Sequence, residues 1–502
     1  MSVPTLPETA PFSPAQRAWL NGFFAGLVSL QGSAGGDRIA EANQPTQEEE
    51  TFPWHDPAMA IAERLELAEG KPIERKMMAA MAQLDCGACG YVCQTYSEAI
   101  ARGEEKNLTL CTPGGKETSA KLKEFVQLGI KVVLPAGGAK PQSAPSGKHD
   151  RKNPFAARLV GQNRLNKPES DKDTRHVMLD LKGSTLSYKP GDALGVWAEN
   201  CPDLVQELLE LLHASGAEEV LTPDEQLTSL REALLRDYTI TQPTEDLFKL
   251  LGQPEAENLA VVDLLRRHGD QPIDPAPFVR ALSPLQPRLY SISSSLRAHP
   301  NQVHLTVGVV RYKSGAGTLC NGTASTYFAD RLRPGQKVRV FVHSSAKFAL
   351  PPSGDTPMIM VGPGTGIAPF RSFLSERKAA GDKGKNWLFF GDQKKDRDFL
   401  YEEEIESMRA AGMLHNLSTA FSRDQEKKVY VQHRMIENGK EIFEWLEQGA
   451  HFYVCGDAKR MATDVDNALK QIVAEQGGMS AEEAAAYVAK LAKENRYQRD
   501  VY

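Results

Sequence analysis

The stretch that decides the fold of the C-terminal part of the chain is residues 357–371, which read Pro357-Met-Ile-Met-Val-Gly-Pro-Gly-Thr-Gly-Ile-Ala-Pro-Phe-Arg371. The apolar run at 358–361 predicts a buried strand, and the segment from Ile367 onward predicts the start of a helix. Glycines between a strand and a helix let the backbone approach a pyrophosphate, whose charge the helix N-terminus favours. The spacing G-x-G-x-G departs from the usual G-x-G-x-x-G, but the context still predicts phosphate binding at Gly362, Gly364, Thr365 and Gly366.

Further apolar runs of strand length lie at residues 387–390 and 451–455 and alternate with helical segments. This alternation predicts a parallel, doubly wound sheet, and residues 496–502 are expected to form a terminal strand. Upstream, the pattern predicts strands over 154–198, helices over 202–285 and strands again over 286–350. The fold class is therefore α/β and multidomain.

Composition sets the domain boundaries and excludes several classes. A length of 502 residues corresponds to about three domains. Residues 31–50 and 135–153 are rich in Gly, Pro, Ser or charge and read as a loop and a linker. The predicted division has five parts. They are an N-terminal helical or linker segment (1–70), a cysteine unit (71–134), a linker (135–153), a strand-rich part with a helical insertion near 200–285 (154–353), and the sheet domain (354–502).

The charge of −6, from 59 basic and 65 acidic residues, argues against a nucleic-acid partner. No apolar run approaches the roughly 20 residues of a membrane helix, and the first residues show no secretory signal. Seven cysteines are an odd number that does not suit a closed disulfide framework. We expect a cytoplasmic enzyme with several cofactors and without membrane contact.

Four cysteines crowd into one segment with the spacing C-x2-C-x3-C-x17-C: Cys86, Cys89, Cys93 and Cys111. Thiolates at such spacing can wrap one metal centre, and neighbouring glycines let backbone amides reach the sulfurs. The spacing favours an iron–sulfur cluster. A structural zinc site, or reduced thiols without metal, remain alternatives.

Two groups of residues suit anionic cofactors. Arg288 can hold a pyrophosphate with its guanidinium fork, Tyr290 can stack on a flavin ring, and Ser291 can reach the ring nitrogens. The small residues from Gly322 to Thr326 can cradle a phosphate, although many helix starts look alike.

A second group supplies hydroxyls, cations and a phenol close together, which favours a 2′-phosphate and therefore NADPH over NADH. Its members are Ser422, Arg423, Lys428, Tyr430 and Gln432. A solvated loop of mixed charge is the alternative. Cys455-Gly456-Asp457 ends a predicted strand, which is where ligands bind in parallel sheets.

Taken together, residues 154–502 resemble the NADPH–FAD half of diflavin reductases, in particular the flavoprotein subunits of NADPH–sulfite reductases. The matching segments are 188–197 (YKPGDALGVW), 288–291 (RLYS), 306–311 (TVGVVR), 322–325 (GTAS), 362–371 (GPGTGIAPFR), 386–391 (NWLFFG), 422–425 (SRDQ), 428–432 (KVYVQ), 453–457 (YVCGD) and 496–502 (RYQRDVY). The cysteine segment, CGACGYVCQTYSEAI with CTPGG after it, resembles the small four-cysteine [4Fe-4S] domain of electron-transfer complexes. It stands in place of the FMN-binding flavodoxin domain of the family.

The resemblance implies a ferredoxin-reductase-like FAD β-barrel with a helical insertion and a doubly wound NADPH domain, preceded by a small Fe–S domain. It implies that hydride transfer involves Ser291, Cys455 and Asp500. FAD would contact Arg288, Tyr290, Ser291, Thr306, Gly322, Ala324, Ser325 and Tyr502, the last covering the flavin ring. NADPH would contact Gly362, Gly364, Thr365, Gly366, Ser422, Arg423, Lys428, Tyr430, Gln432 and Asp457.

These roles predict an electron relay from NADPH to FAD, to [4Fe-4S], and to a haem-containing reductase subunit, with a sirohaem sulfite reductase favoured. The protein positions the two rings, and Asp500 can stabilise the positive charge that develops on nicotinamide. A relay that serves nitrite or nitrate reductase or a cytochrome-type oxygenase is the alternative, as is a redox-sensing subunit.

Overall fold

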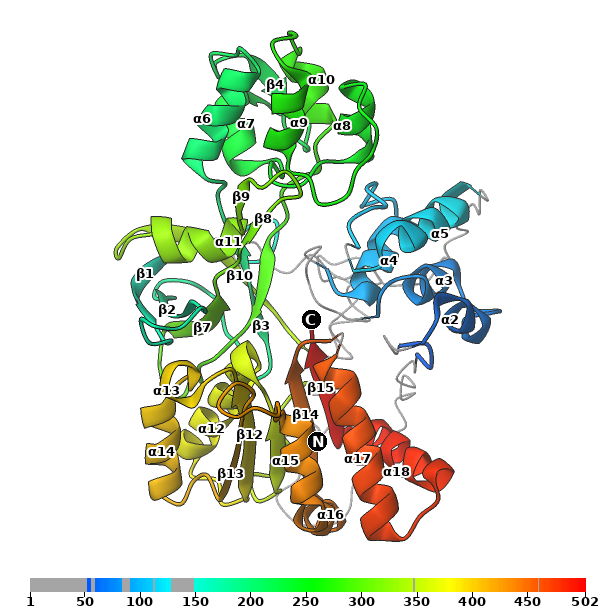
Figure 1. The fold of residues 1–502 in the computed structure, drawn as a ribbon, viewed down its shortest axis with the longest axis vertical. Coiled ribbons are helices and arrows are strands. Elements are labelled where there is room, and N and C mark those ends of the chain that lie inside the picture. The colour runs from blue at the N-terminus through cyan, green and yellow to red at the C-terminus, as the bar shows by residue number, and fades with distance from the viewer. Residues whose placement is uncertain are drawn as a thin grey trace, which may run out of the picture. The chain divides into compact units, whose positions relative to one another are not determined.

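The computed structural model describes residues 52–55, 59–83, 91–111, 113–127, 149–345, 348–458 and 460–502. Residues Pro53–Tyr502 belong to one unit, and Figure 1 shows its helices and strands. The predicted loop at 31–50 and most of the linker at 135–153 lie outside the described residues, as do Cys86 and Cys89. No helix within these ranges is long and apolar enough to cross a membrane.

Helix α2 (Ile61–Leu67) lies in the predicted N-terminal part, and the predicted cysteine unit contains α3 (Ile73–Ala79), α4 (Cys93–Ala101) and α5 (Gly115–Gln127). The apolar faces of α3, α4 and α5 contribute to a small core that includes Met77, Met81, Tyr96 and Leu122. Helix α4 starts at Cys93 because the Thr95 hydroxyl accepts a hydrogen bond from the Val92 amide at 3.2 Å, in the manner of a capping box.

A six-stranded antiparallel sheet follows, with the order β6-β3-β10-β1-β2-β7. Its strands are β1 (Phe155–Arg164), β2 (Thr174–Asp180), β3 (Ala193–Trp197), β6 (Arg288–Ser291), β7 (Gln302–Gly308) and β10 (Lys337–His343). The two edges approach each other, since Ile292 after β6 pairs with Leu305 of β7. The strands predicted before residue 198 and after residue 286 are thus confirmed, and they belong to one sheet.

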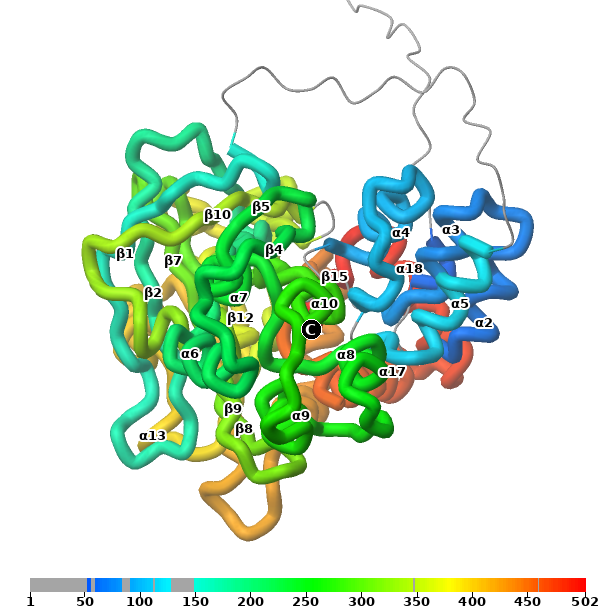
Figure 2. Tube along the Cα trace, turned by 90° about the horizontal axis from the view of Figure 1, so that it is seen from above, coloured from blue at the N-terminus to red at the C-terminus, as the bar shows by residue number. Residues whose placement is uncertain are grey.

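The helices predicted over 202–285 are confirmed as α6 (Pro202–Leu211), α7 (Leu230–Arg236), α8 (Glu245–Leu250), α9 (Val261–His268) and α10 (Pro275–Arg280). They lie together as one cluster in both views (Figures 1 and 2). The pattern missed two short strands in this segment, β4 (Glu219–Leu221) and β5 (Leu227–Ser229). Strands of three residues are too short to show a hydrophobic period.

After the insertion, the chain forms the short pair β8 (Arg311–Lys313) and β9 (Leu319–Asn321). The helix α11 (Thr323–Thr326) then runs into a π-helical turn at Tyr327–Arg331. The predicted helix start beside Gly322 is therefore confirmed.

The C-terminal sheet has five parallel strands in the order β13-β12-β11-β14-β15, which confirms the predicted doubly wound arrangement. The strands are β11 (Met358–Val361), β12 (Asn386–Asp392), β13 (Asn416–Phe421), β14 (His451–Gly456) and β15 (Tyr497–Val501). Strand β15 is the predicted terminal strand and pairs with β14.

Helices cover both faces of this sheet because successive side chains of a strand point to opposite sides. Ile359 and Val361 pack with the helices α15 (Val431–Glu437), α16 (Gly439–Glu447), α17 (Met461–Gly477) and α18 (Ala481–Lys493). Met358 and Met360 pack with α12 (Ile367–Ala380) and α14 (Glu402–Ala410), and the short helix α13 (Lys395–Asp398) precedes α14. All four β11 side chains are buried.

Candidate functional site

The predicted glycine loop connects β11 to α12 and packs tightly on the neighbouring strand β14. A Cβ atom on Gly366 would lie 2.1 Å from the carbonyl oxygen of Cys455, and one on Gly362 would lie 2.5 Å from the carbonyl oxygen of Gly366. Gly364 has φ = +57°, a conformation that side-chain-bearing residues rarely adopt. The loop therefore requires glycine, and it leaves the start of α12 open to an anionic group.

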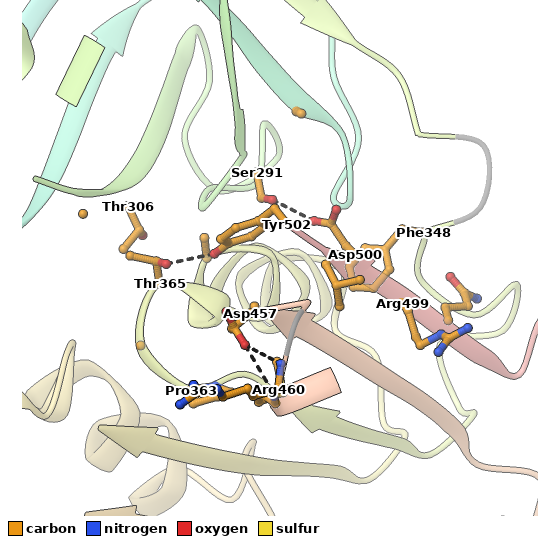
Figure 3. A pocket seen from close by; sticks show the side chains of 18 of the residues that line it. Ser291, Thr306, Phe348, Pro363, Thr365, Asp457, Arg460, Arg499, Asp500 and Tyr502 are labelled. Atoms are coloured by element: carbon orange, nitrogen blue, oxygen red, sulfur yellow. Dashed lines mark hydrogen bonds between the residues drawn. The ribbon is translucent and has the colours of Figure 1, made fainter. Parts of the chain in front are cut away.

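Three side chains that the resemblance assigned to hydride transfer converge from β6, β14 and β15. Figure 3 shows two of them, Ser291 and Asp500. The Ser291 hydroxyl donates a hydrogen bond of 2.7 Å to Asp500 Oδ2, and Cys455 Sγ lies 3.8 Å from the same oxygen. Cys455 and Asp500 are direct neighbours in the parallel pairing of β14 with β15. The Asp500 carboxylate thus accepts from both a hydroxyl and a thiol.

Burial decides the protonation state of this thiol. Cys455 is fully buried, and its desolvation raises the pKa well above the ordinary value; the charge of Asp500 raises it further. Cys455 therefore stays a neutral thiol that donates toward the carboxylate, instead of acting as a thiolate nucleophile.

Tyr502 follows β15 and is fastened by its main chain. Its amide donates to the Gly456 carbonyl at 3.0 Å, and its carbonyl accepts from the Ala458 amide at 3.1 Å. Its phenol group forms a 2.8 Å hydrogen bond with the Thr365 hydroxyl of the glycine loop, and the residue is 45% exposed (Figure 3). The ring can therefore swing away without breaking the pairing of β15.

Ser291, Asp500, Thr365 and Tyr502 border one cavity of about 1990 Å³. Among the predicted residues, its lining includes Arg288, Tyr290, Ser291, Thr306, Gly364, Thr365, Ser422, Tyr430, Gln432, Asp457, Asp500 and Tyr502. The other predicted residues in the described ranges, which do not line it, are Gly322, Ala324, Ser325, Gly362, Gly366, Arg423, Lys428, Cys455, Cys93 and Cys111. The structure thus brings most of the predicted flavin and nucleotide contacts to a single space.

The flavin-side residues have further contacts. Thr306 Oγ1 is 2.7 Å from the Tyr401 phenol oxygen, and Arg288 donates to the Gln286 carbonyl at 3.1 Å. Ser325 accepts a hydrogen bond of 3.1 Å from the Val310 amide, so its hydroxyl shapes the loop that starts at Gly322. A Cβ on Gly322 would lie 2.8 Å from Ser325 Oγ, which explains the glycine.

The residues predicted for a 2′-phosphate lie after β13 and at the start of α15. Lys428 and Tyr430 are exposed, and the Arg423 guanidinium lies 3.9 Å from the exposed carboxylate of Asp171. Ser422 Oγ donates to the Asp392 carbonyl at 3.3 Å, and Gln432 donates to Asp464 at 3.0 Å. These contacts are weak or solvated, so a phosphate can replace them.

Asp457 has a structural role beside its predicted one. Its Oδ1 accepts from the amides of Arg460 at 2.8 Å and Met461 at 3.3 Å, and so caps the start of α17 (Figure 3).

Sequence reasoning missed several lining residues, among them Lys172, Asp392 and Phe348. Asp392 ends a strand whose core, 387–390, was predicted, and a polar residue at the carboxyl end of a parallel strand was the available signal. Lys172 stands in a polar loop between β1 and β2, where the sequence carries no signal of this kind.

The cysteine segment has one sulfur in an environment typical of a metal ligand. Cys111 is 6% exposed, and burial raises the pKa of its thiol, whereas the backbone amides of Ala82 and Gly114 donate toward the sulfur and lower it. A Cβ on Gly114 would lie 3.0 Å from Cys111 Sγ. Amide donors around a buried sulfur suit a thiolate bound to a cation, so this residue fits a cluster.

Cys93 starts α4, while Cys86 and Cys89 lie outside the described residues. Within the described part of the chain there is no group of three or more His, Cys, Asp or Glu side chains that could hold a metal ion.

Two protein-family models match the chain. The model for the oxidoreductase NAD-binding domain matches residues 360–467, and the model for the FAD binding domain matches residues 147–265 and 245–327.

Three relatives carry the same description, sulfite reductase [NADPH] flavoprotein alpha-component. The protein from Bacillus subtilis is 42% identical over 451 residues, which cover 82% of this chain and 73% of the relative. The protein from Photorhabdus laumondii is 46% identical over 375 residues, or 71% of this chain and 62% of the relative. The protein from Vibrio cholerae is 44% identical over 405 residues, or 77% and 65%.

Proposed function

The chain belongs to the family of the sulfite reductase [NADPH] flavoprotein alpha-components and is an NADPH-dependent oxidoreductase; from this we propose that it is an electron-transfer subunit with a [4Fe-4S] cluster as its one-electron exit. The observation that carries the NADPH-to-FAD part of this proposal is the convergence of Ser291 and Cys455 on Asp500. Figure 3 shows Ser291 and Asp500 together with Tyr502. When bound, FAD would supply hydride acceptance and single-electron release, and an iron–sulfur cluster held by the cysteines would supply one-electron acceptance.

The protein's own contribution on the flavin side is a set of residues that would hold the flavin and nicotinamide rings. Tyr290 and Arg288 line the cavity from β6, and Tyr502 lines it from the end of β15. Because the Tyr502 phenol is hydrogen-bonded to Thr365 while its main chain pairs separately with Gly456 and Ala458, a nicotinamide can displace the ring while the main chain stays in place. We assign Tyr502 to covering the flavin and the glycine loop 362–366 to the NADPH pyrophosphate.

Asp500 supplies the electrostatic part of the reaction. When hydride leaves NADPH, positive charge develops on the nicotinamide, and a carboxylate fixed in advance stabilises that charge. The Ser291 hydroxyl and the neutral Cys455 thiol orient the carboxylate. Neither the serine nor the cysteine needs to form a covalent bond with the substrate.

For the exit of electrons we propose the four thiolates of Cys86, Cys89, Cys93 and Cys111 as cluster ligands. Two observations support this assignment: backbone amides point at the Cys111 sulfur, and Cys93 begins a helix, where the peptide dipoles favour a thiolate. Tetrahedral zinc would use the same ligands, so absorption and electron spin resonance spectra of the purified protein decide between them. A protein that contains zinc and no iron would refute the relay.

Electron delivery tests the relay itself, through Cys86→Ser. We expect this variant to reduce its FAD with NADPH at the rate of the unmodified protein and to lose transfer to an external one-electron acceptor. Cys201→Ser is the matched control, because Cys201 precedes α6 at a position where serine is a good helix cap. A redox-sensing subunit would instead deliver electrons normally after Cys86→Ser.

We propose a haem-containing reductase as the acceptor, with a sirohaem sulfite reductase first, because the relatives are described as components of NADPH–sulfite reductase. The test is NADPH-dependent sulfite reduction after mixing the chain with candidate haemoproteins. A response only with a nitrite or nitrate reductase, or with a cytochrome-type oxygenase, would keep the relay and change the partner. The presence of thiols for a cluster agrees with a reducing, cytoplasmic compartment.

A further inference from the structure

The loop between β1 and β2, residues 165–173, reaches from the six-stranded sheet to the parallel sheet. Asn166 Nδ2 donates to Asp398 Oδ1 at 2.9 Å, and the Lys167 amide donates to the Arg397 carbonyl at 2.9 Å. At its far end, the loop places the Lys172 ammonium on the carboxylate of Asp392. The loop therefore docks along the edge where β12 ends.

The Lys172–Asp392 ion pair lies inside the cavity that the proposed function gives to NADPH. The Asp392 side chain is 1% exposed and the Lys172 side chain is 37% exposed. Asp392 Oδ1 also accepts from the Gln393 amide at 2.7 Å. Desolvation raises the pKa of this carboxyl, while Lys172 opposes the shift.

The second carboxylate oxygen of Asp392 faces the glycine loop. A Cβ atom built on Gly364 would lie 3.8 Å from Asp392 Oδ2, and both residues line the cavity. A buried negative charge at this place repels a pyrophosphate on the loop unless a cation neutralises it. Lys172 is the cation that bonds to it, and it comes from the opposite sheet.

We propose that Lys172 is a positioning residue for NADPH: by neutralising Asp392 across the two sheets, it completes the phosphate site when the β1–β2 loop is docked. The inference rests on the proposed placement of NADPH. Binding of the dinucleotide and docking of the loop then support each other, because both depend on the same ion pair.

The test compares Lys172→Met, Asp392→Asn and the double variant in the FAD-loaded protein. Binding of NADP⁺ and of 2′,5′-ADP is measured by titration calorimetry, which needs no turnover. Truncating one partner of a buried charge pair leaves the other unpaired, so Lys172→Met should weaken NADP⁺ binding about tenfold or more. The double variant should bind within about threefold of the unmodified protein, because the unpaired carboxylate is gone.

Lys167→Met is the matched control, since Lys167 lies in the same loop and is exposed, and it should bind NADP⁺ normally. Unchanged binding in Lys172→Met, or a double variant as weak as Lys172→Met, would overturn the inference. If Lys172→Met does not fold, Asp392→Asn decides alone: it should bind NADP⁺ at least as tightly as the unmodified protein, and clearly weaker binding would refute the role. An unmodified protein that fails to bind NADP⁺ would count against the proposed function instead.

Discussion

Two buried histidines at the contact between the sheets make the stability of this protein sensitive to acid. His176 of β2 and His304 of β7 are 7% and 3% exposed, and their ring centroids are 4.9 Å apart. His176 Nδ1 lies 2.9 Å from the phenol oxygen of Tyr401, which precedes α14. Burial lowers the pKa of His176 to about 3 and that of His304 to about 2, and the charge of Arg371 on α12 contributes to both shifts.

The direction of the pH effect follows from these shifts. Above the ordinary histidine pKa of about 6.5, both rings are neutral in the folded and the unfolded chain. In that pH range they do not reduce the free energy of unfolding. As the pH falls below about 6.5, the unfolded chain takes up protons that the buried rings refuse, until the folded-state values are reached. Each ring then costs about 1.4 kcal/mol of unfolding free energy per pH unit, or about 2 kcal/mol between about pH 7.5 and about pH 5.

Removing one of the two rings isolates this effect. His304→Phe keeps a ring of similar size, and it also removes Nδ1 of His304, a buried atom without a hydrogen-bond partner. The variant gives up the 3.1 Å contact between His304 Nε2 and Gln302 Oε1. Its loss of unfolding free energy between about pH 7.5 and about pH 5 should be about 2 kcal/mol smaller than that of the unmodified protein.

Urea unfolding at both pH values, at constant ionic strength, measures the difference. The neighbouring charged and titratable groups that the comparison must leave unchanged are Arg371, Glu376, His299, Tyr401 and Glu404. His213→Asn is the control, because the His213 side chain is 55% exposed in the helical insertion. If His304→Phe loses as much stability on acidification as the unmodified protein, the buried ring does not stay neutral and the reasoning fails.

Two further predictions concern the nucleotide reaction. Asp500→Asn keeps an acceptor for the Ser291 hydroxyl and removes the negative charge. Flavin reduction by NADPH in a stopped-flow experiment should therefore slow by about 100-fold, with little change in KM. A rate close to normal would mean that the carboxylate does not stabilise the transition state. Arg423→Ala should raise KM for NADPH about tenfold and leave KM for NADH nearly unchanged, because a guanidinium recognises the 2′-phosphate that NADH lacks. Equal changes for both nucleotides in steady-state assays would place the 2′-phosphate elsewhere.

Local patterns were enough for much of the architecture. The strand at 358–361, the glycine loop and the start of α12 follow one another along the chain, so hydrophobic period and glycine spacing predicted them directly. The helical insertion was found for the same reason. Strands β4 and β5 escaped because their pairing, and not their own composition, makes them strands.

The site depended on contacts between distant segments. Ser291 and Asp500 are 209 positions apart, and their convergence was expected through family resemblance, while the structure supplies the hydrogen bond. Lys172 and Asp392 are 220 positions apart, and nothing in the sequence indicated that these two side chains would meet. A single chain shows which residues are apolar, small or charged, but the pairing of two charges depends on how the two sheets dock. Thus the sequence determined the elements and the residue types at their ends, and only the tertiary structure decided which carboxylate meets which cation, because desolvation and proximity arise only when the sheets pack together.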